Sequence, residues 1–479
     1  MIDITEVFID TLAPNSAAIK NGQGLVKKRR FVQLNQSEDG VVLFGECGGS
    51  GSSNYYPSAD FVVSDKPVMR CTCPSRQIPC KHVLGLLYAY VGKETFVSAT
   101  IPEDLAVKRE KMSKREERKF ELAAEGANVK PKKVNKSALK KKIGAQLEGL
   151  AVLEKLTQSL IRAGLGTIDA KGVKDIQVHV KMMGNYYLTG AQIELRRLAL
   201  LLSSTDNREK TYLLTIEQLT RIHAFIKKGR AHLTMKLEDP DLSLNHESTI
   251  EEWLGHAWQL TELKECGLMS SDVELIQLSF LSYDDAARQE YVDLGYWIEK
   301  STGNIHRTLQ YRPYKAAKYI HEEDSFTDVA LIPSLYHYPG DRNRRVRFES
   351  MSTRPLTNQD VEWIVSKASH SFSESFKQIK NQLKNPLADK NPVMLLHVNK
   401  ISKSQQDQFV LTDESGQYLV LDQIVALEQD TLALLQYFTL EELSDTTMLL
   451  MFEHQLDTGR LKAQPLTLIK GIEMIRLLY

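Results

Sequence analysis

Residues 71–82 have the sequence Cys71-Thr-Cys73-Pro-Ser-Arg-Gln-Ile-Pro-Cys80-Lys-His82, and this stretch decides the fold of the region around it. It holds three thiols and one imidazole, which is the number and type of ligand that a closed tetrahedral zinc site needs. Cys71 and Cys73 are two residues apart, so an extended backbone points both thiols to the same side. The prolines and the serine that follow favour a turn that brings the chain back to Cys80.

An apolar helical pattern begins directly after Cys80, with Pro79 just ahead of the start. Its apolar face is formed by Val83, Leu84, Leu86, Leu87 and Tyr90. Cys80 and His82 then fall in the first turn, where the positive end of the helix dipole favours a thiolate. We therefore predict one structural Zn²⁺ ion bound by Cys71, Cys73, Cys80 and His82. The alternatives are three ordinary reduced cysteines, or a disulfide in a chain with no sign of secretion.

The length, composition and charge of the chain limit the number of domains and the kinds of partner that we expect. The chain has 479 residues, 42% of them hydrophobic and 25% charged, with a formal net charge of zero. This length predicts two to four domains. A neutral chain has no global attraction to nucleic acid or anionic lipid, so any such attraction must be local. Cys47 and Cys266 stand alone, and we expect both to be small buried apolar side chains.

The first residues and the hydropathy of the chain indicate where in the cell the protein is expected. The start, Met1-Ile-Asp-Ile-Thr-Glu-Val, lacks the basic and apolar regions of a signal peptide. No run reaches the eighteen or more apolar residues that a membrane span requires. We expect a cytoplasmic protein without a membrane partner.

The cysteine spacing, Cys-x-Cys, six residues, then Cys-x-His, resembles the SWIM-type zinc finger and not the longer-spaced two-Cys, two-His finger. Upstream, the stretch Gly45-Glu-Cys-Gly-Gly-Ser-Gly51 followed by Tyr56 is similar to the glycine-containing hairpin of bacterial SWIM proteins. Downstream, residues 80–87 resemble their ligand-bearing helix. The specific motifs lie in residues 1–90, and the four family ligand positions are occupied by Cys71, Cys73, Cys80 and His82. The resemblance implies recognition of DNA or of other proteins, and partnership with an AAA-type ATPase system.

Further elements are expected around the cysteines. Residues 12–26 predict a short helix that is entered after Pro14 and ends at Gly22. Strands are predicted at residues 31–34, 41–45, 61–63 and 68–71. The glycine-rich residues 48–53 lack the Gly-Lys-Ser/Thr ending of a phosphate loop, so a hairpin tip is the better interpretation.

Residues 102–142 form a charged stretch that carries 14 Lys or Arg and 5 Glu between Lys108 and Lys142, a local net charge of +9. We favour a solvated spacer, in which residues 108–122 form a helix and residues 129–142 lead into the next one. The alternative is an arm that contacts nucleic-acid phosphates without sequence preference. Its candidate contacts are Lys130, Lys132, Lys133, Lys136, Lys140, Lys141 and Lys142.

From Ser137 to about Gly229 the apolar spacing is helical. Three helical patterns, at residues 139–160, 191–202 and 216–226, predict a bundle. Residues 248–251 have the Ser-Thr-Ile-Glu sequence of a capping box, expected to open a helix that carries Trp253 and Trp258.

After about Asp272 the period shifts toward two. One hairpin is predicted around residues 301–304, another around 339–341, and further strands at 391–423 and 446–466 in a small barrel or curved sheet. The second hairpin carries Arg342, Arg344, Arg345 and Arg347. We favour an exposed edge strand protected by charge, with an anion or nucleic-acid surface as the alternative.

Together these patterns predict an α+β multidomain protein. It has a small ββα-like zinc-binding N-terminal module, a central helical bundle and a C-terminal β-rich region. The expected divisions are residues 1–100, 101–145, 146–265, 266–390 and 391–479.

No catalytic motif stands out in the sequence. The four-ligand zinc site leaves no open position for water. Residues 321–324, His-Glu-Glu-Asp, are better explained by a solvated loop than by a catalytic site, and we expect His179, His223, His256 and His306 to be ordinary. We predict a non-enzymatic protein-interaction adaptor without a small-molecule substrate, with nucleic-acid binding through the basic arm and arginine cluster as the alternative.

Overall fold

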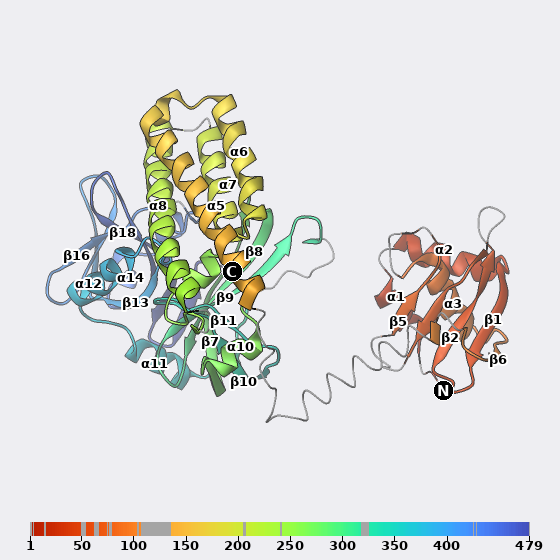
Figure 1. Cartoon of the computed structure of the whole chain (residues 1–479). Coiled ribbons are helices and arrows are strands. Elements are labelled where there is room, and N and C mark those ends of the chain that lie inside the picture. Colours follow the sequence, from red (N-terminus) through yellow and green to blue (C-terminus); the bar gives the residue numbers. More distant parts are fainter. Residues whose placement is uncertain are drawn as a thin grey trace. The chain divides into compact units, whose positions relative to one another are not determined.

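The computed structural model describes residues 2–478 apart from positions 3, 14–15, 49–53, 62–66, 74, 76–78, 103–104, 107–135, 205–206, 240–241, 318–324, 425 and 428. The chain divides into two compact units, Met1–Lys132 and Lys133–Tyr479 (Figure 1). We call them the finger unit and the C-terminal unit. Both contain helices and sheets, so the predicted α+β class is confirmed. No helix in the described part of the chain is both long and apolar enough to cross a membrane.

In the described part of the finger unit, helices cover one sheet. Its strands follow the order β5-β4-β2-β1-β6, and β3 pairs with β2. The strands are β1 (Phe31–Ser37), β2 (Val42–Gly48), β3 (Asn54–Tyr55), β4 (Ser58–Asp60), β5 (Val68–Arg70) and β6 (Val97–Ala99). The helices are α1 (Glu6–Leu12), α2 (Ser16–Lys27) and α3 (Lys81–Val91).

Helix α3 is the centre of the finger unit. It packs against β2 and β4 on the sheet and against α1 and α2. Neighbours on both sides explain why its apolar residues are not confined to one stripe. Val83, Leu84, Leu86 and Leu87 are all fully buried.

Several predicted elements of the finger unit are confirmed and others are corrected. Strands β1, β2 and β5 lie where they were predicted. Helix α2 continues to Lys27 and does not end at Gly22, because Gly22 is a contact point with α3 and not a helix end. Of the strand expected at 61–63, residues 62 and 63 lie outside the described residues and Phe61 is not in a strand; β4 ends just before it, at Asp60. Most of the hairpin tip expected at 48–53 lies outside the described residues. The helix expected at 108–122 lies wholly outside them.

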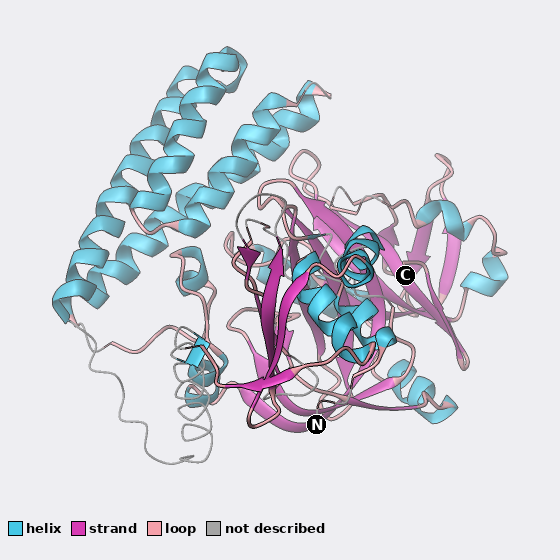
Figure 2. Ribbon diagram, turned by 90° about the vertical axis from the view of Figure 1, so that its right-hand side faces the viewer, coloured by secondary structure: helices cyan, strands magenta, loops and turns pink. Residues whose placement is uncertain are grey.

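The C-terminal unit begins with a helical bundle (Figures 1 and 2). Its helices are α5 (Lys136–Ala163), α6 (Ala170–Asn185), α7 (Thr189–Ser203) and α8 (Arg208–Glu238). They share one apolar core that includes Leu150, Ile176, Leu198 and Phe225. The predicted bundle is present, but α6 was missed. Its buried face of Val173, Ile176, Val180 and Met183 repeats at three and four residues, so the signal was there.

The predicted capping box at residues 248–251 is wrong. Helix α9 (Ile250–Trp253) is only four residues long, and its N-cap Thr249 makes no side-chain cap bond. The Glu251 carboxylate instead accepts from Lys236 and from the backbone N–H of Asn245, and pairs with His232. Trp258 lies beyond this helix, just before α10 (Leu260–Glu265).

Among the residues that the structure describes, three sheets follow the bundle. The first has the order β11-β10-β7-β8-β9, with β12 on β10, the second β13-β17-β18-β19, and the third β14-β15-β16. Their strands are β7 (Met269–Asp285), β8 (Glu290–Glu299), β9 (Ile305–Pro313), β10 (Val329–His337), β11 (Val346–Arg347), β12 (Ser352–Arg354), β13 (Val393–Val398), β14 (Lys400–Lys403), β15 (Phe409–Thr412), β16 (Tyr418–Val420), β17 (Thr446–His454), β18 (Leu461–Lys470) and β19 (Glu473–Arg476). Helices α11 (Asn358–Ser366), α12 (Phe372–Leu383), α13 (Leu432–Leu435) and α14 (Leu440–Leu443) complete the unit.

Both predicted hairpins are confirmed as β8–β9 and β10–β11. The strands after residue 391 form two sheets and not one barrel. Ile276 and Tyr296 of the first sheet share an apolar core with Val393, Leu449 and Leu466 of the second. Residues on both sides of position 390 therefore pack together. The predicted division into residues 1–100, 101–145, 146–265, 266–390 and 391–479 stays a prediction.

Candidate metal centre

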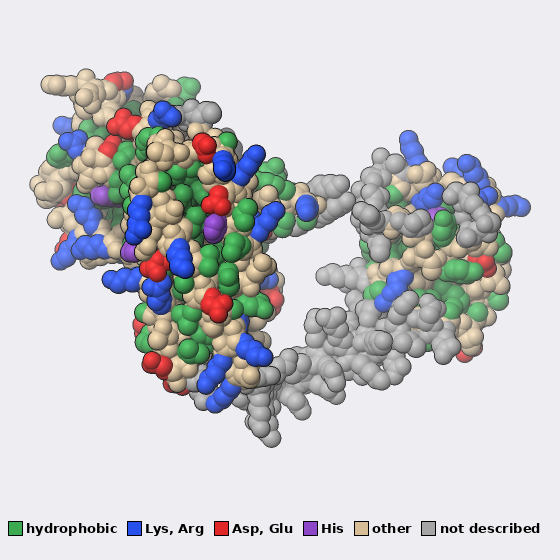
Figure 3. Space-filling view, turned by 45° about the horizontal axis from the view of Figure 1, so that its top comes forward, with side chains coloured by type: hydrophobic (Ala, Val, Ile, Leu, Met, Phe, Trp, Pro, Cys, Tyr) green, Lys and Arg blue, Asp and Glu red, His purple; other side chains and the backbone are tan. Residues whose placement is uncertain are grey.

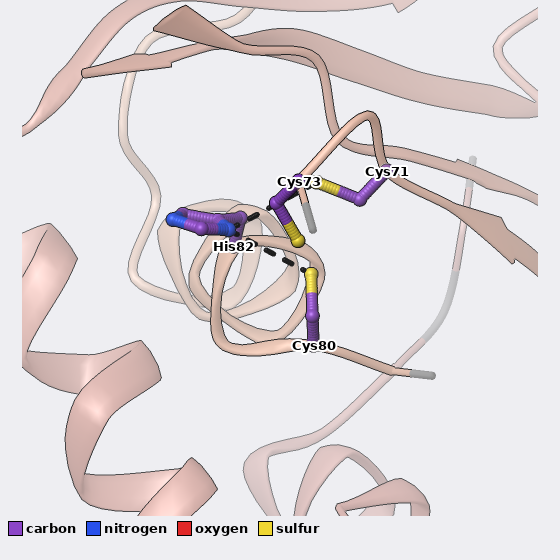
Figure 4. Close-up of side chains that lie close together, drawn as sticks. All are labelled: Cys71, Cys73, Cys80 and His82. Carbon is purple, nitrogen blue, oxygen red and sulfur yellow. Dashed lines mark hydrogen bonds between the residues drawn. The ribbon is translucent and has the colours of Figure 1, made fainter. Parts of the chain in front are cut away.

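The four predicted ligands converge at one end of α3. Cys71 and Cys73 follow β5, Cys80 is the N-cap residue of α3, and His82 lies in its first turn (Figure 4). Their ligand atoms all lie within 4.8 Å of one another. The Nδ1 atom of His82 is 3.9 Å from the Sγ of Cys71 and 3.8 Å from the Sγ of Cys80.

These distances fit a zinc ion. Zinc–sulfur and zinc–nitrogen bonds of about 2.3 and 2.0 Å place a sulfur and a nitrogen about 3.5 Å apart in a tetrahedron. The two distances at His82 differ from that value by a few tenths of an ångström. Three sulfurs and one nitrogen fill a tetrahedral shell. The four residues would therefore hold one Zn²⁺ ion in a closed, structural site.

The local electrostatics favour a thiolate at Cys80. The hydrogen bond from the Cys71 thiol lowers the pKa of Cys80, and bonds from His82 and the Val83 N–H add to this against the opposing effect of burial. The result is a pKa of about 3. The same bond to Cys80 raises the pKa of Cys71, and burial raises that of Cys73. Zinc binding would displace the protons from these two thiols, as metal binding to cysteines generally does.

Neighbouring residues orient the ligands. The His82 ring is buried and lies 4.8 Å, centroid to centroid, from the ring of Tyr55. The backbone N–H of Tyr56 donates to the Thr72 hydroxyl at 3.0 Å, which ties the segment between the first two cysteines to the sheet. Groups of this kind commonly fix the orientation of metal ligands.

Cys47 lies close to this centre in sequence but is not one of the four clustered ligands found among the described residues. Its side chain is fully buried, and burial is the main reason why its pKa is raised to about 11. It is therefore a protonated, apolar side chain of the finger core, as predicted. Cys266 was expected to be buried but is partly exposed, and it packs against the cluster of Trp258, Leu263 and Tyr338 in the C-terminal unit.

The range 69–91 contains the last strand residues before Cys71, all four ligands and the whole of α3. Residues 69–91 match the SWIM zinc finger family. The predicted resemblance is thereby confirmed for this part of the chain, and the SWIM finger with its three cysteines and one histidine is consistent with one zinc ion. No curated protein and no solved structure matches the chain.

The predicted nucleic-acid contacts lie in two places. Lys130, Lys132 and Lys133 fall outside the described residues. Lys136 and the run Lys140–Lys142 are exposed in the first two turns of α5.

The arginine cluster does not form one face of a strand, because only Arg347 lies within β11. The Arg345 guanidinium lies over the ring of Tyr338, 4.2 Å from its centroid. Arg342 donates to Gln378, and Arg344 donates to the Gly340 carbonyl. Arg342 and Arg344 instead line a cavity of about 770 Å³.

Sequence reasoning missed a histidine pair in the same cavity. His306 is buried and its Nε2 lies 2.8 Å from the Glu299 carboxylate, while the Nε2 of His337 lies 3.0 Å from the Ser270 hydroxyl. The His306 and His337 rings meet edge to face at 5.2 Å. Glu299 and His306 flank the predicted hairpin turn and lie diagonally across the paired strands, since Trp297 is the residue opposite His306, and this diagonal placement was the available signal. The acidic stretch 321–324 lies outside the described residues.

Proposed function

We propose that this chain is a non-catalytic adaptor for protein partners, in which zinc holds the SWIM finger folded. The closed donor set supports this proposal, since three thiols and one imidazole leave no coordination position for a substrate. On the face drawn in Figure 3, Lys and Arg side chains of the C-terminal unit are interspersed with Asp and Glu. A mixed surface of this kind fits protein partners better than a polyanion.

The observation that carries the proposal is a group of exposed apolar side chains on α13, on α14 and on the segment between them. Leu434, Tyr437 and Leu440 are 37%, 80% and 41% exposed. Exposed aromatic and aliphatic side chains on rigid supports are typical protein contact points. The support is rigid here because Lys470 donates to the carbonyls of three residues, Glu441, Glu442 and Ser444, at the end of α14.

The test is affinity purification of the tagged chain from native lysate, with and without nuclease. We expect a protein partner that survives nuclease and is lost when Leu434 and Tyr437 are both changed to Ser. Tyr418→Ser is the matched control, because Tyr418 is 68% exposed but lies on β16, away from α13 and α14 in sequence. Capture of the same proteins by this double variant would count against the adaptor. The SWIM resemblance makes an AAA-type ATPase the first partner to look for.

A second candidate function is nucleic-acid binding, favoured by the charge at the start of α5. The first turn of α5 has no acidic residue, and Lys136 and Lys140–Lys142 are exposed within its first two turns. Positive charge in the first turn of a helix opposes the helix dipole, so the dipole does not account for Lys136. Contact with phosphates would give the exposed run Lys140–Lys142 a role.

This candidate is tested by fluorescence anisotropy with a labelled DNA duplex at several salt concentrations. If Lys140, Lys141 and Lys142 contact phosphates, changing all three to Gln should reduce the slope of log affinity against log salt by about 3. The control changes Lys171, Lys174 and Lys181 of α6, which are equally exposed. Binding that is absent at low salt, or insensitive to salt, would exclude this function.

A further inference from the structure

A second group of metal-binding side chains lies in the C-terminal unit. His370, His397 and Glu414 place one possible ligand atom each within 4.8 Å of the others. The Nδ1 of His370 is 3.6 Å from a carboxylate oxygen of Glu414, and the two imidazole rings stack with centroids 4.5 Å apart. We propose that these three residues bind a second divalent transition-metal ion, separate from the SWIM finger.

The backbone that carries the three ligands is held in place by hydrogen bonds. Ser369 donates its N–H to the Leu395 carbonyl and accepts from the His397 N–H, both at 3.0 Å. This pair of bonds joins the segment of His370 to β13, which carries His397. Both histidines therefore have fixed backbone positions.

Asp413 fixes the third ligand. Its side chain is buried and accepts from the backbone N–H of Phe372 at 2.9 Å, two residues after His370. The other carboxylate oxygen accepts from the N–H groups of Ser415 and Gln417 at 3.0 and 2.9 Å. Asp413 thus ties the turn that carries Glu414 to the start of α12. A supported arrangement of this kind is what a preorganised ligand set requires.

Asp445 supplies the outer partner of one histidine. Its carboxylate lies 3.4 Å from the Nε2 of His397. Histidines that bind metals usually donate their second ring N–H to a carboxylate or carbonyl. Asp445 is 85% exposed, and with its carboxylate beside Nε2 the metal of the proposed site would bind Nδ1 of His397.

An ion pair alone does not explain the cluster. His370 and Glu414 are 58% and 66% exposed, and exposed pairs contribute only about 0–1 kcal/mol. Two stacked imidazoles repel each other when both are protonated, whereas a metal ion binds their neutral forms. Two imidazoles and a carboxylate favour zinc, copper, nickel or iron over magnesium and calcium. Three protein ligands leave at least one position for water or for a ligand from a partner.

The test uses the full chain dialysed against Zn²⁺, with metal measured by mass spectrometry. We expect two zinc ions per chain for the wild type and one after His370→Ala with His397→Ala. His179→Ala should keep two, because His179 also lies near a carboxylate, Asp175 at 3.9 Å, but is not part of a metal-ligand group among the described residues.

The milder variant Glu414→Gln guards against a folding defect, since its side chain is exposed. We expect it to lower the affinity of the second zinc ion at least tenfold while tryptophan fluorescence stays unchanged. Cobalt at this site should give visible bands without the thiolate charge-transfer bands of the finger. One zinc ion in the wild type, or two in the double variant, would overturn the proposal.

Discussion

Gly22 of α2 faces Gly85 of α3 so closely that neither position has room for an ordinary side chain. A Cβ atom on Gly22 would lie 2.9 Å from the Cβ of Leu84 and 3.2 Å from the Gly85 nitrogen. A Cβ on Gly85 would lie 3.2 Å from the Gly22 carbonyl oxygen. The helix that carries Cys80 and His82 is therefore positioned by a close contact between two helices.

We predict that Gly22→Ala destabilises the finger unit by about 1–3 kcal/mol, because the added carbon must push α2 away from α3. Gly24→Ala is the control in the same helix, where a Cβ would meet nothing within 4 Å. It should stabilise the unit by up to about 1 kcal/mol through helix propensity. Denaturant unfolding of the cobalt-loaded chain, followed by the cobalt–thiolate absorption, measures both. Equal effects of the two substitutions would contradict the prediction.

The ligand set could be predicted from the sequence because the chemistry is local. Cys71, Cys73, Cys80 and His82 lie within twelve residues, and the apolar pattern after Cys80 marks α3. The extension of α2 past Gly22 was not predictable in this way. Glycine usually marks a helix end, and only the contact with Gly85, far away in sequence, shows that here it serves helix packing.

The cluster in the C-terminal unit shows the same limit. His370, His397 and Glu414 belong to three separate elements, and their approach depends on the buried side chain of Asp413. Nothing in their spacing along the chain predicts this. The capping-box pattern at 248–251 failed for a related reason, since Glu251 pairs with His232, a residue of another helix.

Loss of a finger ligand should release zinc and unfold the finger. We expect Cys80→Ser to lose one zinc ion per chain and to unfold residues from about 40 to 95, because zinc binding supplies folding free energy directly. His82→Ala should behave in the same way. Metal content and hydrogen exchange measure the two effects.

Cys47→Ala is the control for the finger ligands. Cys47 is fully buried beside the centre but is not a ligand, so its removal should lower stability and leave the zinc content unchanged. Full metal content in Cys80→Ser, with unchanged hydrogen exchange, would show that the ligand assignment is wrong.

A buried ion pair joins β8 and β9 in the C-terminal unit. Two guanidinium nitrogens of Arg312 donate to the Asp293 carboxylate at 2.8 and 2.9 Å, and the side chains are 7% and 0% exposed. Arg312→Met leaves the Asp293 charge buried without a partner, so we expect the free energy of unfolding to fall by about 3–5 kcal/mol. All four tryptophans lie between residues 253 and 363, so urea unfolding followed by tryptophan fluorescence reports on this unit.

The matched control for this pair is Arg230→Met. Arg230 pairs with Glu154 at 2.6 Å, but the side chains are 42% and 30% exposed, and pairs of this kind contribute at most about 1 kcal/mol. Adding Asp293→Asn to Arg312→Met should recover part of the loss, because the buried charge is then removed. If Arg312→Met and Arg230→Met lowered the free energy of unfolding by similar amounts, the prediction would be contradicted.

The Glu299–His306 pair should make the C-terminal unit sensitive to acid. The hydrogen bond from His306 is the main reason why the pKa of Glu299 falls to about 2, against an ordinary value of 4.5. A lowered carboxyl pKa stabilises the fold above the unfolded value and loses that effect as pH falls through the folded one. We therefore expect Glu299→Gln to lower the free energy of unfolding by about 3 kcal/mol at neutral pH. This difference from the wild type should shrink below pH 4.5 and vanish near pH 2.

Urea unfolding at several pH values measures this difference. The control is Glu362→Gln, because the Glu362 carboxylate is exposed on α11. A difference that stays constant from neutral pH to pH 2 would mean that the carboxylate charge does not stabilise the fold.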